Sequence, residues 1–252
     1  YEFVGGMASI DVLGKITKGE IVQYVVTIPE GYSIEQIARI LQEKGLVSKD
    51  EFIKLTQNSD FLAKHNFHAD DLEGYLFPDT YNFTQQMEPE SMVQAMIERF
   101  NKGWTEKLQA RAAELDMSVH QIMTLASVIE KETGDPQERG LISGVFHNRL
   151  RKKIPLQSDP TVIYGLAHFD GNLSKEDLTV DSPYNTYRFR GLPPGPIASP
   201  GEASIRAALY PIPTNYLYFV SRNDGSHQFS TTLAEHNLAV KKYQLQRRRR
   251  SS

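Results

Sequence analysis

An apolar stretch that ends in two carboxylates constrains this chain more than any other part of it. The stretch reads Leu125-Ala-Ser-Val-Ile-Glu-Lys-Glu-Thr133. Just upstream, Ser118-Val-His-Gln121 has the pattern of a capping box, in which the serine and glutamine side chains satisfy the first free amides of a helix. Apolar residues then recur at i, i+3, i+4 and i+7, so the sequence predicts an amphipathic helix from about Val119.

The two glutamates fall on opposite edges of the apolar stripe of this helix. Glu132 lies seven residues after Leu125 and extends one edge, whereas Glu130 falls on the other. A carboxylate at the border of a buried face is costly unless it is paired or protonated, and a carboxyl protonated near neutral pH can act as a general acid. From these residues alone, an ordinary solvated helix end is the commoner alternative.

The composition is that of an ordinary globular protein, with 40% hydrophobic and 23% charged residues among 252. A formal net charge of −3 gives no case for nucleic-acid binding, and the one dense basic run, Arg247 to Arg250, is typical of a solvated tail. Cysteine is absent, which excludes disulfides and thiol catalysis. Because the chain opens on Tyr1-Glu-Phe-Val-Gly-Gly, a strand-and-turn pattern, we expect a truncated start whose missing part holds a targeting or membrane segment.

Small α and β units fill the first seventy residues. The β-branched and aromatic stretch 23–28 predicts a strand, and Ser33-Ile-Glu-Gln36 and Ser48-Lys-Asp-Glu51 predict two capped helices after it. A further helix is predicted within residues 1–19. Its apolar face carries Ile10, Leu13 and Ile16.

The residue composition of the sequence changes at Asp71. An aromatic stretch around a glycine and a proline predicts a shaped loop or strand edge, and later patterns predict several helices and a hairpin over 217–230. Asp159 before Pro160 suits a helix N-cap, and Ser199-Pro-Gly-Glu202 predicts a capping box for a helix over 202–209. The last helix is predicted to run from Thr232 to about Gln246. The predicted fold class is α+β, with a small α/β N-terminal portion over 1–70 and a larger mixed domain over 71–252.

Motifs for metal binding and for an activated nucleophile are missing. There is no His-Glu-x-x-His, no Gly-x-Ser-x-Gly and no glycine-rich phosphate loop, so no metal and no cofactor is expected. What remains is three carboxylates, Glu73, Glu130 and Glu132, together with neutral hydrogen-bonding and aromatic side chains, a set that suits a carbohydrate site. The neutral side chains are Asn148, Gln157, Tyr164, Asn185 and Tyr187, and each is as common in a loop-fixing role.

Six blocks of the sequence resemble the MltG (YceG-like) family of endolytic murein transglycosylases. The blocks are Glu73-Gly-Tyr-Leu-Phe-Pro-Asp-Thr-Tyr81, Ala126-Ser-Val-Ile-Glu-Lys-Glu-Thr133, Val145-Phe-His-Asn-Arg-Leu150, Leu156-Gln-Ser-Asp-Pro-Thr-Val-Ile-Tyr-Gly165, Tyr184-Asn-Thr-Tyr187 and Gly191-Leu-Pro-Pro-Gly-Pro-Ile-Ala-Ser-Pro-Gly201. They occur in the family's order within about residues 27–243. One block alone would be weak, but six in order are specific.

The resemblance implies a LysM-like N-terminal portion, incomplete in 1–70, and a YceG-like catalytic domain over 71–252. It also implies a single-pass inner-membrane protein with an extracytoplasmic catalytic domain, of which this chain is a soluble fragment. Peptidoglycan glycan strands are the implied substrate, and peptidoglycan synthases are implied partners.

The mechanism that the resemblance implies uses Glu132 twice. Glu132 protonates the oxygen that links N-acetylmuramic acid to N-acetylglucosamine, and its carboxylate then takes a proton from the muramyl 6-hydroxyl, which attacks its own anomeric carbon. The product is a 1,6-anhydromuramyl end, and elongation of the nascent strand stops. Glu73 and Glu130 have supporting roles, either like-charge repulsion that keeps the proton on Glu132 or contact with sugar. The side chains expected to bind substrate are Asn148, Gln157, Asp159, Tyr164, Asn185 and Tyr187.

Two alternatives stay open at the level of sequence. One is a lysozyme-type muramidase, in which water replaces the 6-hydroxyl and a second carboxylate takes part. The other is a non-catalytic glycan-binding scaffold that recruits wall synthases.

Overall fold

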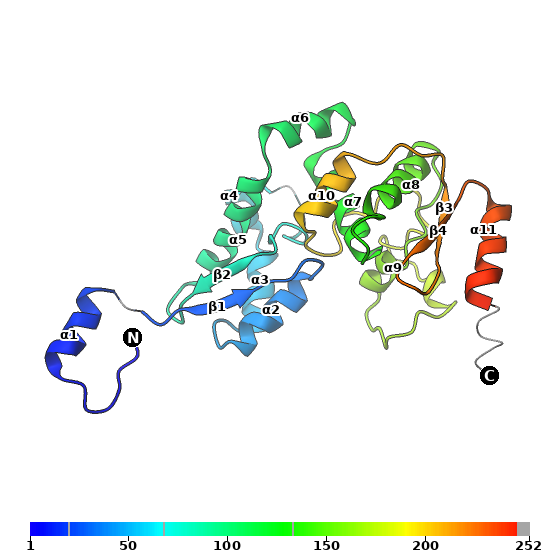
Figure 1. Cartoon of the computed structure of the whole chain (residues 1–252). Coiled ribbons are helices and arrows are strands. Elements are labelled where there is room, and N and C mark those ends of the chain that lie inside the picture. The colour runs from blue at the N-terminus through cyan, green and yellow to red at the C-terminus, as the bar shows by residue number, and fades with distance from the viewer. Residues whose placement is uncertain (20, 68, 133, 246–252) are drawn as a thin grey trace.

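The computed structural model describes residues 1–19, 21–67, 69–132 and 134–245. Helices make up nearly half of these residues, and the strands form two separate two-stranded antiparallel sheets (Figure 1). This confirms the predicted α+β class. In chain order the elements are α1 (Ser9–Thr17), β1 (Tyr24–Thr27), α2 (Ile34–Glu43), α3 (Lys49–Thr56), α4 (Ser59–Lys64), β2 (Thr80–Phe83), α5 (Pro89–Gly103), α6 (Glu106–Glu114), α7 (Val119–Glu132), α8 (Arg139–Arg151), α9 (Asp159–Gly165), the 3₁₀ turn η1 (Asp177–Thr179), α10 (Glu202–Leu209), β3 (Tyr218–Ser221), β4 (His227–Ser230), α11 (Leu233–Val240) and the π turn η2 (Lys241–Leu245).

The N-terminal unit has its own hydrophobic core, which begins at Val26 and extends to Ile97. β1 pairs antiparallel with β2, so that Tyr24 lies opposite Phe83. The capping box predicted at Ser33 is present and starts α2, whose buried face packs into this core. The expected boundary near residue 70 therefore falls inside the unit, because β1 has its partner strand beyond that point. The LysM-like character of this unit stays a prediction.

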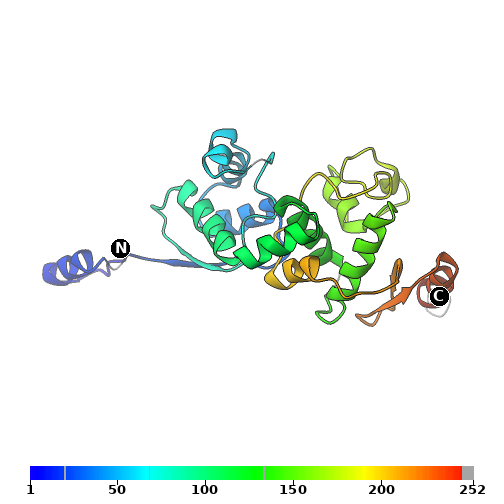
Figure 2. The same ribbon diagram turned by 90° about the horizontal axis from the view of Figure 1, so that it is seen from above.

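The second core surrounds α7. The predicted capping box is present, since the Ser118 amide donates to Gln121 Oε1 at 2.8 Å and the Gln121 amide donates to Ser118 Oγ at 3.1 Å. The predicted apolar stripe is completely buried. α10 packs along α7, and α6, α8 and α9 also contact it. α7 is thus the central helix of the second core (Figures 1 and 2).

The proline-rich segment 191–201 lies along α7 and contacts both the second core and the N-terminal unit. His120 Nε2 donates to the Pro194 carbonyl at 2.7 Å, and the Ile197 amide donates to Ser127 Oγ at 3.0 Å. At the far end of the segment, Ser199 forms an antiparallel bridge with Tyr32 of the N-terminal unit. These contacts hold a loop of irregular backbone along one helix.

The capping predicted for α9 and α10 is wrong, although both helices are present. Ser158, not Asp159, is the N-cap residue of α9, with Asp159 as the first helical residue. α10 begins at Glu202 as predicted, but Gly201 is its N-cap and the Ser199 hydroxyl is buried without a hydrogen-bond partner, so the predicted capping box does not form. The predicted end of the last helix, at Gln246, lies outside the described residues.

α1 is the predicted first helix, and it lies apart from both cores (Figures 1 and 2). Its apolar side chains stay in solvent, with Ile10 72% exposed and Leu13 55% exposed. None of the helices in the described ranges has the length and hydropathy needed to cross a membrane.

Candidate active site

The two glutamates at the end of α7 have separate surroundings. Glu130 Oε2 accepts the Gly201 amide at 3.1 Å and the Ser204 hydroxyl at 2.6 Å, and Oε1 lies 3.8 Å from the Arg139 guanidinium. Gly201 is the N-cap of α10, so the Glu130 carboxylate occupies the position of a helix cap and faces the positive end of that helix. The Glu130 carboxylate therefore binds the start of α10 and stabilises its packing against α7.

Glu132 is the last residue of α7, and its carboxyl faces a cavity. Ser158 Oγ donates to its Oε1 at 2.6 Å, and Oε2 has no hydrogen-bond partner among the described residues. Burial raises the pKa of Glu132 to about 7, against the Ser158 hydrogen bond and the charge of Arg149, which lower it; the charge of Asp159 raises it further. The carboxyl therefore carries a proton in a large share of molecules at neutral pH and has one oxygen free to use it.

The cavity in front of Glu132 has a volume of about 500 Å³. Its walls come from α7, α8, the segment before α9, the β3–β4 hairpin, α11 and η2. The lining residues are Glu132, Arg149, Leu156, Gln157, Asp159, Tyr187, Phe219, Val220, Ser221, His227, His236, Val240 and Gln244. The volume is within the usual range for small-ligand sites, and the walls mix aromatic, amide and charged groups as a sugar site does.

Three of the residues predicted to bind substrate lie in this cavity beside Glu132. Tyr187 donates its hydroxyl to Asp159 Oδ1 at 2.5 Å. Gln157 adopts a left-handed backbone conformation with φ of 51°, and its side-chain oxygen accepts from Arg149 at 3.4 Å. The structure thus gathers Gln157, Asp159 and Tyr187 around one carboxyl, and their part in substrate binding stays a prediction.

Glu73 and Tyr164 belong to a different groove. Both Glu73 carboxylate oxygens accept the Ile34 amide at 3.2 Å, at the start of α2, and Oε2 also accepts the Tyr164 hydroxyl at 3.2 Å. Burial, reinforced by the charge of Asp71, raises the pKa of Glu73 to about 8, against these hydrogen bonds. The groove has a volume of about 710 Å³ and lies between α2, α3 and the segment that follows α9.

The expected like-charge support of Glu132 by Glu73 and Glu130 is wrong. The acidic group whose charge raises the pKa of Glu132 is Asp159. Glu73 is clamped in its own groove, and Glu130 is turned toward α10.

Asn148 and Asn185 are held by backbone groups. Asn148 Nδ2 donates to the carbonyls of Thr214 and Tyr216 at 2.8 and 2.9 Å, and the side chain is buried. Asn185 Nδ2 donates to the carbonyls of Leu178 and Val180, and its residue is fully buried. Each amide uses both of its protons internally, so their predicted part in substrate binding finds no support in this geometry.

Sequence reasoning missed several residues of the cavity. Ser158 and Arg149 stand inside two of the resembling blocks, but neither is among the residues predicted for the site. His227 and His236 come from the hairpin and from α11, distant in sequence from Glu132. Only the fold brings them together.

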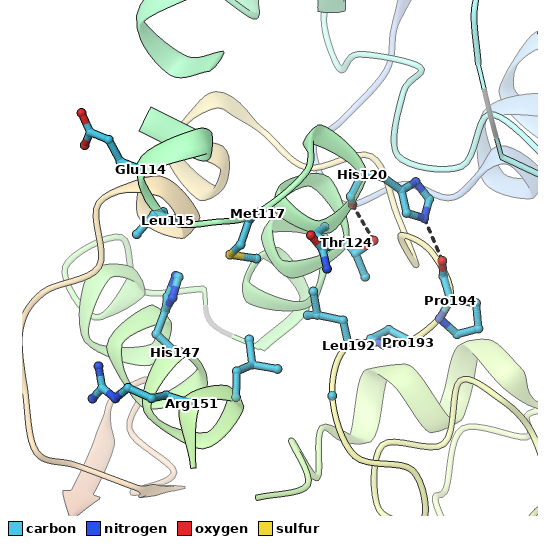
Figure 3. Close-up of a pocket in the computed structure, with 13 residues that line it drawn as sticks. Glu114, Leu115, Met117, His120, Thr124, His147, Arg151, Leu192, Pro193 and Pro194 are labelled. Atoms are coloured by element: carbon cyan, nitrogen blue, oxygen red, sulfur yellow. Dashed lines mark hydrogen bonds between the residues drawn. The ribbon is translucent and has the colours of Figure 1, made fainter. Parts of the chain in front are cut away.

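A larger cavity of about 750 Å³ lies at the opposite end of α7. Figure 3 shows its walls, with His120 and Thr124 from α7, His147 and Arg151 from α8, and Leu192 to Pro194 from the proline-rich segment. His120 is held by the Pro194 carbonyl, and its backbone carbonyl accepts the Thr124 hydroxyl at 2.7 Å. This cavity contains none of the residues that the sequence predicted for the site.

Within the part of the chain that the structure describes, no group of three or more His, Asp or Glu side chains is placed to hold a metal ion.

Comparison with known proteins agrees with the six sequence blocks. The model of the YceG-like family matches residues 1–242. The endolytic murein transglycosylase of Bacillus subtilis (strain 168) is 37% identical over 259 residues, which cover 96% of this chain and 72% of that protein. The endolytic murein transglycosylase of Streptococcus pneumoniae serotype 2 (strain D39) is 29% identical over 272 residues, 95% of this chain and 49% of that protein.

The fold agrees as well. The 2.6 Å crystal structure of a yceG-like protein from Listeria monocytogenes is similar, with a TM-score of 0.78 at 37% identity, over 94% of this chain and 83% of that chain. A model match over nearly the whole chain, a relative at 37% identity and a shared fold lead to one conclusion: this chain belongs to the YceG-like family.

Proposed function

We propose that this chain is a lytic transglycosylase of peptidoglycan, with Glu132 as its general acid. The bond cleaved is the β-1,4 bond between N-acetylmuramic acid and N-acetylglucosamine, and the product is a 1,6-anhydromuramyl end that terminates a nascent strand. The names of the Bacillus and pneumococcal relatives support the substrate class and the type of reaction. They carry no information on the residues.

One observation carries the assignment of Glu132. This carboxyl combines a pKa of about 7 with an oxygen, Oε2, that accepts no hydrogen bond from the described residues. A general acid works best when its pKa lies near the working pH, because it must be protonated and still give its proton away. The Ser158 hydroxyl fixes Oε1 and leaves Oε2 toward the cavity.

The reaction then follows from the placement of this proton. Glu132 transfers it to the glycosidic oxygen as the bond to the anomeric carbon breaks and positive charge develops on the sugar ring. The muramyl 6-hydroxyl attacks the same anomeric carbon and releases its own proton. In the one-carboxyl mechanism implied by the resemblance, the Glu132 carboxylate accepts that proton, and no water is consumed.

Gln157, Asp159 and Tyr187 support this function by their position in the cavity. The aromatic ring of Tyr187 offers a face to the C–H surface of a sugar, and the amide of Gln157 can meet its hydroxyls. The Tyr187–Asp159 hydrogen bond fixes both side chains. Tyr164 would meet a glycan only if the strand also entered the groove at Glu73.

The muramidase alternative needs a second carboxylate beside the acid. Asp159 lines the cavity beside Glu132, and its Oδ1 accepts the Tyr187 hydroxyl. A second carboxylate is therefore present, and the products of digestion distinguish attack by the 6-hydroxyl from attack by water or by Asp159.

The products of digestion test the proposal. Purified peptidoglycan strands are incubated with the protein, and the released muropeptides are weighed by mass spectrometry, with Glu132→Gln as the matched inactive control. We expect 1,6-anhydro ends, which lack one water relative to hydrolysed ends. Reducing ends would establish a muramidase, and strand binding without any cleavage would establish a scaffold.

The resemblance also supports a working place outside the cytoplasmic membrane, with the protein held there by a membrane segment and acting beside peptidoglycan synthases. Fractionation of cells and crosslinking of the native protein test these two points.

A further inference from the structure

A glutamate–histidine pair stands in the wall of the cavity, on the β3–β4 hairpin. His227 Nδ1 lies 2.6 Å from Glu138 Oε2, and the backbone amide of His227 donates to Glu138 Oε1 at 2.9 Å. Glu138 is the N-cap residue of α8, so the pair joins the hairpin to the start of that helix. The two side chains are only 13% and 14% exposed.

This pair fixes the imidazole in one orientation. The Glu138 carboxylate can only accept, so the proton of a neutral His227 ring sits on Nδ1 and Nε2 carries the free lone pair. Phe219 packs edge-to-face against the ring at 5.5 Å, and Phe229 lies at 6.5 Å on the same hairpin. Nε2 has no hydrogen-bond partner among the described residues. The result is an oriented ring, on a residue that lines the cavity, whose Nε2 is not used by the described residues.

His227 and Glu132 line the same cavity of about 500 Å³. The other charged or titratable groups in its walls are Arg149, Asp159, Tyr187 and His236. Arg149 is a permanent cation and Tyr187 donates its hydroxyl to Asp159, so Asp159, whose Oδ1 accepts that hydroxyl, is the other candidate proton acceptor in these walls.

His236 gives a useful contrast. It lines the same cavity and stacks on Tyr218 at 5.2 Å, but its Nδ1 is buried without a hydrogen-bond partner. No carboxylate orients it. Of the two histidines, only His227 has a carboxylate that orients its ring among the described residues, so it is the better candidate for a base.

We propose that His227 is a second catalytic residue, which accepts the proton of the muramyl 6-hydroxyl, and that Glu138 is the residue that positions it. This rests on the proposed transglycosylase function and changes its second half-step: the acceptor is the imidazole rather than the Glu132 carboxylate.

The step balances without any further reactant. The Glu132 proton moves to the glycosidic oxygen, the bond from that oxygen to the anomeric carbon breaks, and the freed sugar end leaves with its new hydroxyl. The 6-oxygen bonds to the anomeric carbon while its proton passes to His227 Nε2. After product release, the imidazolium gives up one proton and Glu132 regains one, so the enzyme returns to its starting state.

The pH profile separates the two mechanisms. If Glu132 serves as both acid and base, kcat/KM depends on one protonated group and shows a single alkaline limb. If His227 is the base, it must also be unprotonated, and the profile acquires an acid-side limb and becomes bell-shaped. The experiment measures release of anhydro-muropeptides by the intact chain between pH 4.5 and 9.

His227→Asn is the decisive variant, because asparagine can still donate to Glu138 from about the position of Nδ1 but has nothing at Nε2. We expect kcat to fall by roughly 10²-fold or more, KM to change little and the acid-side limb to vanish. His236→Asn is the matched histidine in the same cavity, and it should keep the acid-side limb.

Glu138→Gln tests the positioning role. A glutamine side chain can donate as well as accept, so it no longer fixes the proton of the ring on Nδ1, and kcat should fall, though less than in His227→Asn, while KM changes little. Circular dichroism and thermal melting check that the variants are folded. If His227→Asn does not fold, the presence or absence of the acid-side limb in the wild-type profile decides.

A wild-type profile with only an alkaline limb, or a His227→Asn variant with unchanged kcat, overturns this inference and leaves the proposed function standing. A Glu138→Gln variant with unchanged kcat overturns the role of Glu138. Loss of anhydro products from the wild type, or an active Glu132→Gln variant, is a separate result that overturns the proposed function itself.

Discussion

Two carboxyls whose pKa is strongly raised, Glu73 and Glu132, lie at opposite ends of α9. At its C-terminal end, Tyr164 donates to Glu73, and at its N-terminal end Ser158 donates to Glu132. Both carboxyls line a cavity, but both oxygens of Glu73 accept hydrogen bonds and the residue is only 4% exposed, whereas Glu132 is partly exposed and accepts one hydrogen bond from the described residues.

This difference separates a structural carboxyl from a reactive one. Burial raises both pKa values, to about 8 for Glu73 and about 7 for Glu132. A raised pKa shows that a group holds its proton, but catalysis also requires that a substrate atom can reach it. Access distinguishes the two carboxyls, and the following variants test that distinction.

The largest expected effect is on the chemical step. Glu132→Gln removes the transferable proton at constant shape, so we expect kcat to fall by about 10²- to 10⁴-fold while uncleaved strands still bind. Glu73→Gln is the matched change at the other end of α9, and its loss should stay below about tenfold. Single-turnover release of muropeptides measures both. Equal losses would show that access does not separate the two carboxyls.

The next effect is on stability, and it belongs to Glu73. A carboxyl with a pKa raised from 4.5 to about 8 binds more protons in the folded state between these values, so the free energy of unfolding falls as pH rises through that window. The steepest slope for one group is about 1.4 kcal/mol per pH unit.

Urea unfolding between pH 5 and 8 measures this slope. The experiment is done in the Glu132→Gln background, so that the titration of Glu132 does not contribute. Adding Glu73→Gln should flatten the curve. A slope that persists in the double variant would mean that another group is responsible.

Glu130 should affect stability more than chemistry. Glu130→Ala removes hydrogen bonds to Gly201 and Ser204 and the cap of α10, at a cost of about 1 to 3 kcal/mol. Chemical unfolding should register this loss, and kcat should stay close to that of the wild type. If Glu130→Gln abolishes cleavage in a folded protein while Glu132→Gln does not, then Glu130 is the acid.

The smallest expected effect is a shift in the pH profile. The Ser158 hydrogen bond lowers the pKa of Glu132, so Ser158→Ala should raise that pKa and move the alkaline limb of kcat/KM to higher pH by roughly half to one unit. Tyr164→Phe removes the corresponding donor from Glu73 and should leave the limb in place. A shift to lower pH in Ser158→Ala would contradict the assignment.

Local signals predicted the helices well. The Ser118 and Ser33 boxes rely on bonds between residues three apart, so they form without any contribution from distant segments. The Ser199 box failed because the bridge from Ser199 to Tyr32 and the Glu130 carboxylate occupy the places that it needed. Tertiary contacts outweighed the local preference there.

The site was predictable only in part, for a similar reason. Gln157, Asp159 and Tyr187 were recognised because they stand in short blocks whose order is informative. Amide side chains bond sugars and backbone carbonyls equally well, so sequence alone could not distinguish the role of Asn148 from that of Gln157. The pair of His227 and Glu138 gave no signal, since 89 residues separate its members.

The sequence by itself determined that a buried helix ends in two carboxylates and that the chain carries the blocks of one family. Helical spacing places Glu130 and Glu132 on different sides of α7, but it says nothing about what lies on each side. The tertiary structure decided that, because residues 201–204 fold onto one side and residue 158 onto the other. The pKa of a carboxyl depends on burial and neighbouring charge, and both are properties of packing between distant segments.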